Sequence, residues 1–154
     1  MQGRCPCQQR PTCLRETCGP GYSAYGDHCY KYISEAVTWS QARARCRAEQ
    51  GDLASVHNRA ENEFIRGLSR GERLWLGGRR SSRDFTWSDG SVWDFDNWDG
   101  GEPNNYFQDE DCLELYTQRA AWNDDHCSLF SSPFVCKAGR VCAGATVASV
   151  ALLY

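Results

Sequence analysis

The segment at residues 102–127 reads EPNNYFQDEDCLELYTQRAAWNDDHC, and it is the most informative part of this chain. It lies in an acidic region, because ten of the 20 Asp and Glu residues fall between positions 94 and 125, where Arg119 is the only basic residue. Carboxylates packed this densely along a chain repel one another unless a cation neutralises them. The region is therefore either a solvated acidic surface or a cation site.

The side chains in this segment favour a particular kind of cation. Ca²⁺ takes about six to eight oxygen ligands, and carboxylate and amide oxygens are its usual donors in proteins. None of the candidate ligands is soft, which argues against zinc or copper. Three of them carry a negative charge, so a site that held Ca²⁺ would keep a net charge of about −1. The candidate calcium ligands are Glu102, Asn104, Glu110, Asn123 and Asp124.

The same residues can also hold a sugar. Two neighbouring hydroxyls of a pyranose can replace water on the ion, while each hydroxyl donates to a carboxylate and accepts from an amide N–H. Glu102 with Asn104 provides one such pair of acceptor and donor, and Glu110 with Asn123 provides a second. Tyr106 flanks these residues and is a further candidate for contact with the sugar.

Outside this segment the chain alternates between patterns typical of helices and of strands. Thr38 begins a capping box before one amphipathic run, and Asn58 begins a second helix with an apolar stripe. Residues 88–111 have no helical or strand period, which is typical of a functional loop. If the Glu102–Pro103 bond in this loop is cis, both flanking side chains can point to one side. The predicted strands are 74–78, 85–87, 112–116, 120–122 and 133–137.

Composition restricts the compartment and the partners. Ten cysteines in 154 residues, without the spacing of a zinc site, predict disulfides, so we expect a secreted or extracellular protein. The formal net charge of −3 argues against nucleic acid as a partner. The most apolar run, residues 141–154, is too short to span a bilayer whose hydrocarbon core is about 30 Å thick.

Several motifs together make the chain resemble the C-type lectin-like domain over residues 18–137. The sequence WLGG at 75–78 resembles the core strand motif of that family. EPN at 102–104 resembles its mannose-type signature, and WND at 122–124 resembles its second calcium motif. A lone EPN would be weak, but its occurrence with the other two motifs and six cysteines in order makes the match specific.

The resemblance implies an α+β fold in which two helices pack on antiparallel sheets, with a long calcium-binding loop and disulfide bridges. It implies that the five candidate ligands bind both calcium and sugar. It also implies a preference for sugars with equatorial 3- and 4-hydroxyls, namely mannose, glucose, N-acetylglucosamine, or fucose through equivalent hydroxyls. Glycans or glycoproteins are the expected partners. The implied bridges are Cys18–Cys29, Cys46–Cys136 and Cys112–Cys127.

The resemblance also predicts the organisation of the chain. Residues 1–17 form a cysteine-rich N-terminal extension, 18–137 the carbohydrate-recognition domain and 138–154 a C-terminal tail. Four cysteines lie outside the three implied bridges. One of the first three could pair with the last, and the others could bridge chains in an oligomer. These four are Cys5, Cys7, Cys13 and Cys142.

Two groups of side chains have a structural and a functional interpretation. Residues 79–83 hold three arginines where family members with a second, structural calcium carry acids, so a second calcium is not favoured. Asp111 remains as a possible ligand for it, and we expect the arginines to be solvated. The tryptophans of the acidic region are expected to pack the loop down rather than to stack on sugar; they are Trp93, Trp98 and Trp122.

Two other functions compete with sugar binding. The same scaffold could bind a protein or an ice surface, but such a role does not require paired Glu and Asn side chains. An enzyme is not expected, because the adjacent acids Glu110 and Asp111 would face opposite sides of a strand. A glycosidase instead needs two carboxyl groups on either side of one bond.

Overall fold

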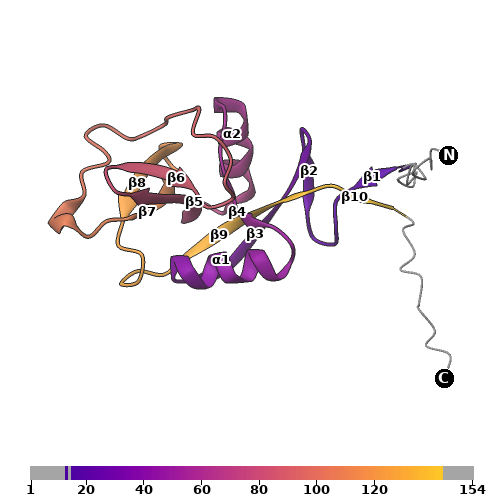
Figure 1. The fold of residues 1–154 in the computed structure, drawn as a ribbon, viewed down its shortest axis with the longest axis horizontal. Helices are drawn as coiled ribbons and strands as arrows, with labels where there is room; N and C mark the ends of the chain where they lie inside the picture. Colours follow the sequence, from indigo (N-terminus) through magenta and orange to yellow (C-terminus); the bar gives the residue numbers. More distant parts are fainter. Residues whose placement is uncertain (1–12, 14, 144–154) are drawn as a thin grey trace, which may run out of the picture.

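A computed structural model of the chain describes residue 13 and residues 15–143, and its arrangement is shown in Figure 1. Cys5, Cys7, most of the predicted N-terminal extension and most of the predicted tail lie outside the described residues. In chain order the elements are β1 (Glu16–Thr17), β2 (Ser23–Tyr25), β3 (His28–Val37), α1 (Trp39–Ala48), β4 (Asp52–Leu53), α2 (Arg59–Leu68), β5 (Arg73–Ser81), β6 (Asp84–Trp87), the 3-10 turn η1 (Tyr106–Gln108), β7 (Cys112–Tyr116), β8 (Ala121–Asp125), β9 (Ser132–Gly139) and β10 (Val141–Cys142). No helix among the described residues has the length and apolar character needed to cross a membrane.

Eight of the strands form one sheet. Its main path runs β2-β3-β9-β5-β7-β8, with β4 paired to β9 and β6 paired to β5. The neighbours are antiparallel except β5 and β9, which meet as parallel strands at Trp75 and Phe134. The predicted α+β class is therefore confirmed. All five predicted strands are present, and β8 runs past its predicted end to Asp125, so it includes Asn123 and Asp124.

The core lies on both faces of this sheet. In β5, Leu74 and Leu76 belong to one hydrophobic cluster, whereas Trp75 between them belongs to another. Successive side chains of a strand point to opposite faces, so the two clusters lie on opposite sides of the sheet. Helix α2 adds Ile65 to the first cluster and helix α1 adds Trp39 to the second. Figure 1 shows the two helices on opposite sides of the sheet accordingly.

Both helices begin at the predicted caps. The Thr38 hydroxyl accepts from the backbone N–H of Gln41 at 3.4 Å, and the Gln41 side chain accepts from the Thr38 N–H at 3.1 Å, which completes the capping box. The Asn58 side chain accepts from the N–H of Glu61 at 2.8 Å. Each cap satisfies backbone donors that a helix cannot pair within itself.

Four disulfide bonds connect the described residues. Three are the pairs that the resemblance implies, Cys18–Cys29, Cys46–Cys136 and Cys112–Cys127. The fourth is Cys13–Cys142, which lies beside the pairing of β1 with β10. This small two-stranded sheet lies outside the predicted domain boundaries of 18 and 137, and it joins the chain before the domain to the chain after it.

Residues 88–111 form the predicted long loop, interrupted only by η1 and by a β-bridge between Trp98 and Trp122. The loop is tied to β8, because the Trp122 N–H donates to the carbonyl of Asn97 at 2.8 Å. Trp93 joins the same aromatic group, with its ring centroid 6.2 Å from that of Trp98 and 5.7 Å from that of Trp122. The prediction that these tryptophans pack the loop is confirmed. The loop is therefore fixed against the strand that carries two of the candidate ligands.

Candidate functional site

The last part of the long loop and the end of β8 meet at one edge of the molecule. The backbone N–H groups of Asn104 and Asn105 donate to the Asp124 carboxylate at 3.0 and 2.8 Å. Strand β7 pairs with β8 so that Glu114 lies opposite Asn123. A cavity of about 620 Å³ opens between the loop, these strands and the segment after β8. Its lining residues are Arg73, Glu102, Asn104, Tyr106, Phe107, Asp109, Glu110, Tyr116, Asn123, Asp125, His126, Leu129 and Phe130.

Most of the predicted site residues share this cavity. The predicted ligands Glu102, Asn104, Glu110 and Asn123 all line it, and so does the predicted sugar contact, whose side chain is exposed; this is Tyr106. Asp124 does not line the cavity. Its side chain is fully buried behind the loop, where it accepts the two backbone hydrogen bonds described above.

Carboxylate and amide groups alternate around the cavity. The Asn104 side-chain N–H donates to Glu102 at 3.1 Å, and the peptide bond between Glu102 and Pro103 is cis. The Tyr106 N–H donates to the Glu110 carboxylate at 2.8 Å. Hydrogen-bond donors and acceptors are thus presented together, as a polyhydroxylated ligand requires.

Burial and neighbouring acids raise two pKa values at this site. Burial, together with the neighbouring Asp124 and Glu110 carboxyl groups, raises the pKa of Glu102. Burial, with Asp124 and Asp125 nearby, likewise raises the pKa of Glu110. The protein therefore leaves negative charge at the cavity incompletely compensated, and a bound cation would relieve this repulsion.

The donors fit a hard cation in kind, since all five predicted ligands offer oxygen. In residues 13 and 15–143, however, no group of three or more His, Cys, Asp or Glu side chains is arranged to hold a metal ion. Two of the predicted ligands are asparagines, and the carboxylate of Asp124 is turned toward the loop backbone. Calcium at this cavity would consequently depend on the amide oxygens of Asn104 and Asn123 as well as on Glu102 and Glu110.

The expectation that the arginines of residues 79–83 are solvated is wrong for Arg80. Its side chain is only 13% exposed, and its guanidinium donates to the buried Asp124 at 2.7 Å. It also lies 3.2 Å from the Asp111 carboxylate and donates to the carbonyl of Glu110 at 3.0 Å. A buried carboxylate needs such a partner, because an unpaired buried charge is strongly destabilising. Asp111, the remaining candidate for a second calcium, is therefore paired with a positive charge of the protein itself.

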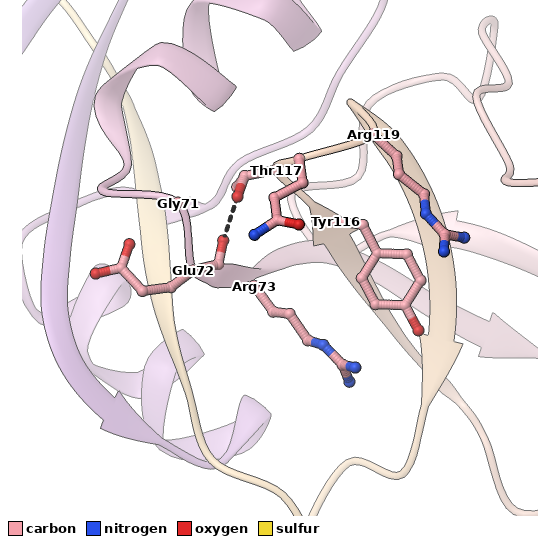
Figure 2. A pocket seen from close by; sticks show the side chains of 7 residues that line it. Gly71, Glu72, Arg73, Tyr116, Thr117 and Arg119 are labelled. Atoms are coloured by element: carbon pink, nitrogen blue, oxygen red, sulfur yellow. Dashed lines mark hydrogen bonds between the residues drawn. The ribbon is translucent and has the colours of Figure 1, made fainter.

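A second cavity adjoins the first. It has a volume of about 500 Å³ and contains none of the predicted ligands, but it shares Arg73 and Tyr116 with the first cavity. Figure 2 shows the Tyr116 ring between two guanidinium groups, and the central carbons of Arg73 and Arg119 lie 4.8 and 5.9 Å from the ring centroid. The hydroxyl of Thr117 donates to the carbonyl of Glu72 at 2.7 Å, which links two residues that line this cavity (Figure 2).

Sequence analysis missed several residues of the first cavity. Asp125 is not one of them: it flanks the predicted ligands directly after the WND motif, which makes it a candidate for contact with the sugar, and in the structure it is buried and lines the cavity. The apolar residues Phe107, Leu129 and Phe130 had a weaker signal, as large hydrophobic side chains next to polar motifs. No sequence signal pointed to Arg73, because it belongs to β5, which is far from the motifs along the chain.

The side chains of Ser55, His57 and Asp94 lie in the same order as the catalytic triad of a hydrolase, but they do not meet its requirements. The Ser55 hydroxyl lies 3.2 Å from His57 Nε2, and His57 Nδ1 lies 2.7 Å from the Asp94 carboxylate. Ser55 is fully buried, and its hydroxyl donates to Asp89 at 2.5 Å. A nucleophilic serine must instead be accessible and donate to the histidine. This group is therefore structural.

Comparison with known proteins places the chain in a family. The family model of the lectin C-type domain matches residues 35–138. The chain belongs to this family. The C-type lectin domain is a binding module, in agreement with the expectation that the chain is not an enzyme.

Two curated relatives show how much of the chain is shared. The chain is 37% identical over 142 residues to C-type mannose receptor 2 of Mus musculus, a match that covers 88% of this chain and 10% of the receptor. It is 34% identical over 137 residues to a lectin of Pleurodeles waltl, covering 82% of this chain and 79% of that lectin. The chain thus spans about a tenth of the length of the mannose receptors that it matches.

Solved C-type lectin domains have the same fold. One is the cow carbohydrate-recognition domain of CD23, which was solved in the presence of an oligosaccharide of N-acetylglucosamine and mannose. It superposes with a TM-score of 0.77 at 30% identity, and the match covers 83% of this chain and 100% of that one. A calcium-independent type II antifreeze protein also superposes with a TM-score of 0.77, at 26% identity, covering 82% of this chain and 98% of that one. The fold of this lectin domain is therefore shared by proteins with different ligands.

Proposed function

We propose that this lectin domain binds carbohydrates through one bound calcium ion. The proposed ligands are sugars with equatorial 3- and 4-hydroxyls, namely mannose, glucose, N-acetylglucosamine or fucose. The observation that carries the proposal is the common cavity of Glu102, Asn104, Glu110 and Asn123, in which two carboxylates and two amides face the same space. This set of groups matches both the preferences of Ca²⁺ and those of a pair of hydroxyls.

The residues of the site would act in two ways. When bound, Ca²⁺ supplies a positive charge with open coordination positions for sugar oxygens. Glu102 and Glu110 accept hydrogen bonds from the sugar hydroxyls, and Asn104 and Asn123 donate to the same hydroxyls. Asp124 holds Asn104 in place through the backbone and keeps the loop on β8. Tyr106 lies at the cavity mouth, where it can contact the sugar.

The setting of the domain is part of the same proposal. Four disulfides in the described residues favour an oxidising compartment, so we place the protein outside the cell or in the secretory route. Residues 18–137 would form the carbohydrate-recognition domain, with glycans or glycoproteins as partners. Cys5 and Cys7 lie outside the described residues, and their use in an oligomer stays a prediction.

Affinity chromatography tests the proposal directly. The full chain should be retained on immobilised mannose in the presence of Ca²⁺ and should elute with free mannose or with a chelator, but not with the same concentration of galactose. Glu102→Gln should lower retention at least about tenfold, because it removes a charged acceptor that contacts both ion and sugar. Glu63→Gln is the matched control, since Glu63 is an exposed residue of α2 outside the cavity, and it should behave like the unchanged chain.

The alternative is a protein or ice ligand on the same scaffold, a possibility supported by the likeness to an antifreeze protein. In that case free mannose would not compete with the natural ligand, whereas a chelator could still weaken binding by loosening the loop. Competition by sugar is therefore the result that decides between the two. A chain that neither binds mannose nor responds to Glu102→Gln would contradict the proposed function.

A further inference from the structure

Exposed apolar side chains gather around the cavity of the proposed sugar site. Among the described residues six large hydrophobic side chains are exposed, and four of them line this one cavity. Their exposed fractions are 62% for Tyr106, 83% for Phe107, 74% for Leu129 and 53% for Phe130. Contiguous exposed apolar surface on a soluble domain marks a place where something binds.

The four side chains form two walls. Tyr106 and Phe107 belong to η1 and form the first wall, with their ring centroids 4.2 Å apart. Leu129 and Phe130 follow β8 and form the second wall. The proposed ligands Glu102, Asn104, Glu110 and Asn123 line the same cavity, so a ligand held by them has apolar surface beside it.

His126 joins the two walls. Its Nε2 lies 2.8 Å from the carboxylate of Asp109, which follows η1. Its Nδ1 accepts from the backbone N–H groups of Ser128 and Leu129 at 3.2 and 3.0 Å. The ring of His126 thereby connects the residue after η1 to the segment after β8.

The backbone keeps Phe107 in place on the first wall. Phe107 has a φ of 55°, and the flanking Asn105 and Gln108 have φ values of 48° and 58°. A bulky residue rarely adopts this left-handed conformation, which persists only where the surrounding structure enforces it. Here the Gln108 N–H donates to the carbonyl of Asn105 at 2.7 Å, and the Asn105 side chain accepts from the N–H of Glu110 at 3.1 Å.

We infer that the preferred ligand carries an acyl or alkyl chain next to the recognised sugar hydroxyls, and that this chain lies between the two walls. The inference rests on the proposed function and names the class of glycan, an acylated or alkylated sugar. Leu129 is aliphatic and offers no ring face for stacking, and the side chains of both walls are exposed and apolar, so this part of the cavity suits a chain of methylene groups better than a second sugar. The cavity volume of about 620 Å³ lies in the range of cavities that enclose ligands larger than one monosaccharide.

Calorimetric titration of the full chain with Ca²⁺ and a series of mannosides tests this inference. The probes are methyl, hexyl and octyl α-mannoside, each below its micelle-forming concentration, and a mannose disaccharide. We expect hexyl mannoside to bind at least about tenfold more tightly than methyl mannoside, since each buried methylene contributes about fourfold. The heat-capacity change of binding should become more negative with chain length, as burial of apolar surface requires.

Three variants locate the effect. Phe107→Asn and Leu129→Asn should abolish most of the increase in affinity that a longer alkyl chain gives. The affinity of each variant for methyl mannoside should stay within about twofold of that of the unchanged chain. Asparagine is chosen because it tolerates the left-handed conformation of residue 107. Val92→Asn is the matched control, because Val92 is also an exposed hydrophobic residue, at 68%, but does not line the cavity. This variant should keep the full gain.

Each other result has a distinct meaning. Equal affinity for methyl and octyl mannoside, or a gain that survives in both wall variants, overturns the inference and leaves the proposed function standing. A disaccharide that gains as much as hexyl mannoside and loses it in the variants assigns the walls to a second sugar. If sedimentation shows a dimer that is lost in the two wall variants, and affinity does not depend on chain length, the two walls are instead an interface with a second copy of the chain. If no mannoside binds at all, the proposed function fails and the inference with it.

Discussion

At the scale of single residues, Asp124 serves the fold and the site at once. It is fully buried, it accepts from the backbone of Asn104 and Asn105, and it pairs with Arg80. Arg80 also contacts Asp111, so one guanidinium neutralises two acids at the base of the loop. The arginine thereby supplies from within the chain a positive charge that partly neutralises this acidic region.

Arg80→Gln should therefore lower the free energy of unfolding by about 3 kcal/mol, since it leaves the buried Asp124 without its charged partner. Urea denaturation, followed by tryptophan fluorescence, measures this change. Arg83→Gln is the control, because Arg83 is exposed, and it should change stability by less than about 0.5 kcal/mol. A loss that is equally small for Arg80→Gln would show that Asp124 does not depend on this pair.

The pairing of acids with amides at the cavity predicts an exchange of specificity. In the double variant, Glu102→Gln replaces a carboxylate by a neutral amide, and Asn104→Asp replaces an amide by a carboxylate. The net charge is unchanged, so calcium affinity should fall little, while the preference should shift from mannose toward galactose. A glycan array compares the two proteins. An unchanged profile would mean that these side chains do not contact the sugar.

At the scale of secondary-structure elements, one buried side chain connects helix α2 to strand β8. The amide of Asn62 donates to the carbonyl of Ala120 at 2.9 Å and accepts from the indole N–H of Trp122 at 2.8 Å. Trp122 in turn carries the backbone contact with the long loop. The helix on one face of the sheet thus supports the strand and the loop that form the site.

Asn62→Ala should lower the free energy of unfolding by about 2 kcal/mol, because it leaves the buried indole N–H of Trp122 without an acceptor. The carbonyl of Ala120 keeps the side chain of Asn97 as a donor. Thermal and urea denaturation check the loss. Glu63→Ala, at the neighbouring exposed position, should be nearly neutral, and equal effects of the two substitutions would contradict the role given to Asn62.

Which elements could be predicted from the sequence follows from how local their signals are. The capping box at Thr38 and the WND strand are contained within a few residues, so their patterns predicted helix and strand correctly. The role of Arg80 depends on Asp124, 44 positions away, and no local pattern reveals that pairing. The second wall follows the WND motif closely along the chain, but no local pattern reveals that Leu129 lines the cavity, because this depends on the turn that His126 holds.

At the scale of the whole molecule, an ion pair inside the core joins α2 to β9. Lys137 donates to Glu61 at 2.5 Å, and both side chains are almost fully buried. Burial alone would raise the pKa of Glu61, but hydrogen bonds from Lys137, from the hydroxyl of Tyr30 and from the backbone of His57 outweigh it and lower the pKa of Glu61 below its usual value of 4.5.

This shift gives stability a defined dependence on pH. Because the folded pKa of Glu61 lies below the unfolded one, its contribution is fully present above about pH 4.5 and is lost as the pH falls through the folded pKa. Glu61→Gln should cost about 3 kcal/mol at pH 7, by leaving Lys137 unpaired, and clearly less at pH 2.5. Urea denaturation at the two pH values measures the difference. A cost that does not change with pH would show that the carboxylate charge is not what stabilises the fold.

The small sheet of β1 and β10, with the bond between Cys13 and Cys142, brings the incoming and outgoing chain together far from the long loop (Figure 1). With this geometry, anything attached through those strands lies on the side opposite the proposed sugar site. Given the proposed sugar binding, several such domains on one support would contact a glycan-coated surface at the same time. Weak individual contacts would then sum to strong adhesion, because each contact after the first forms at high local concentration.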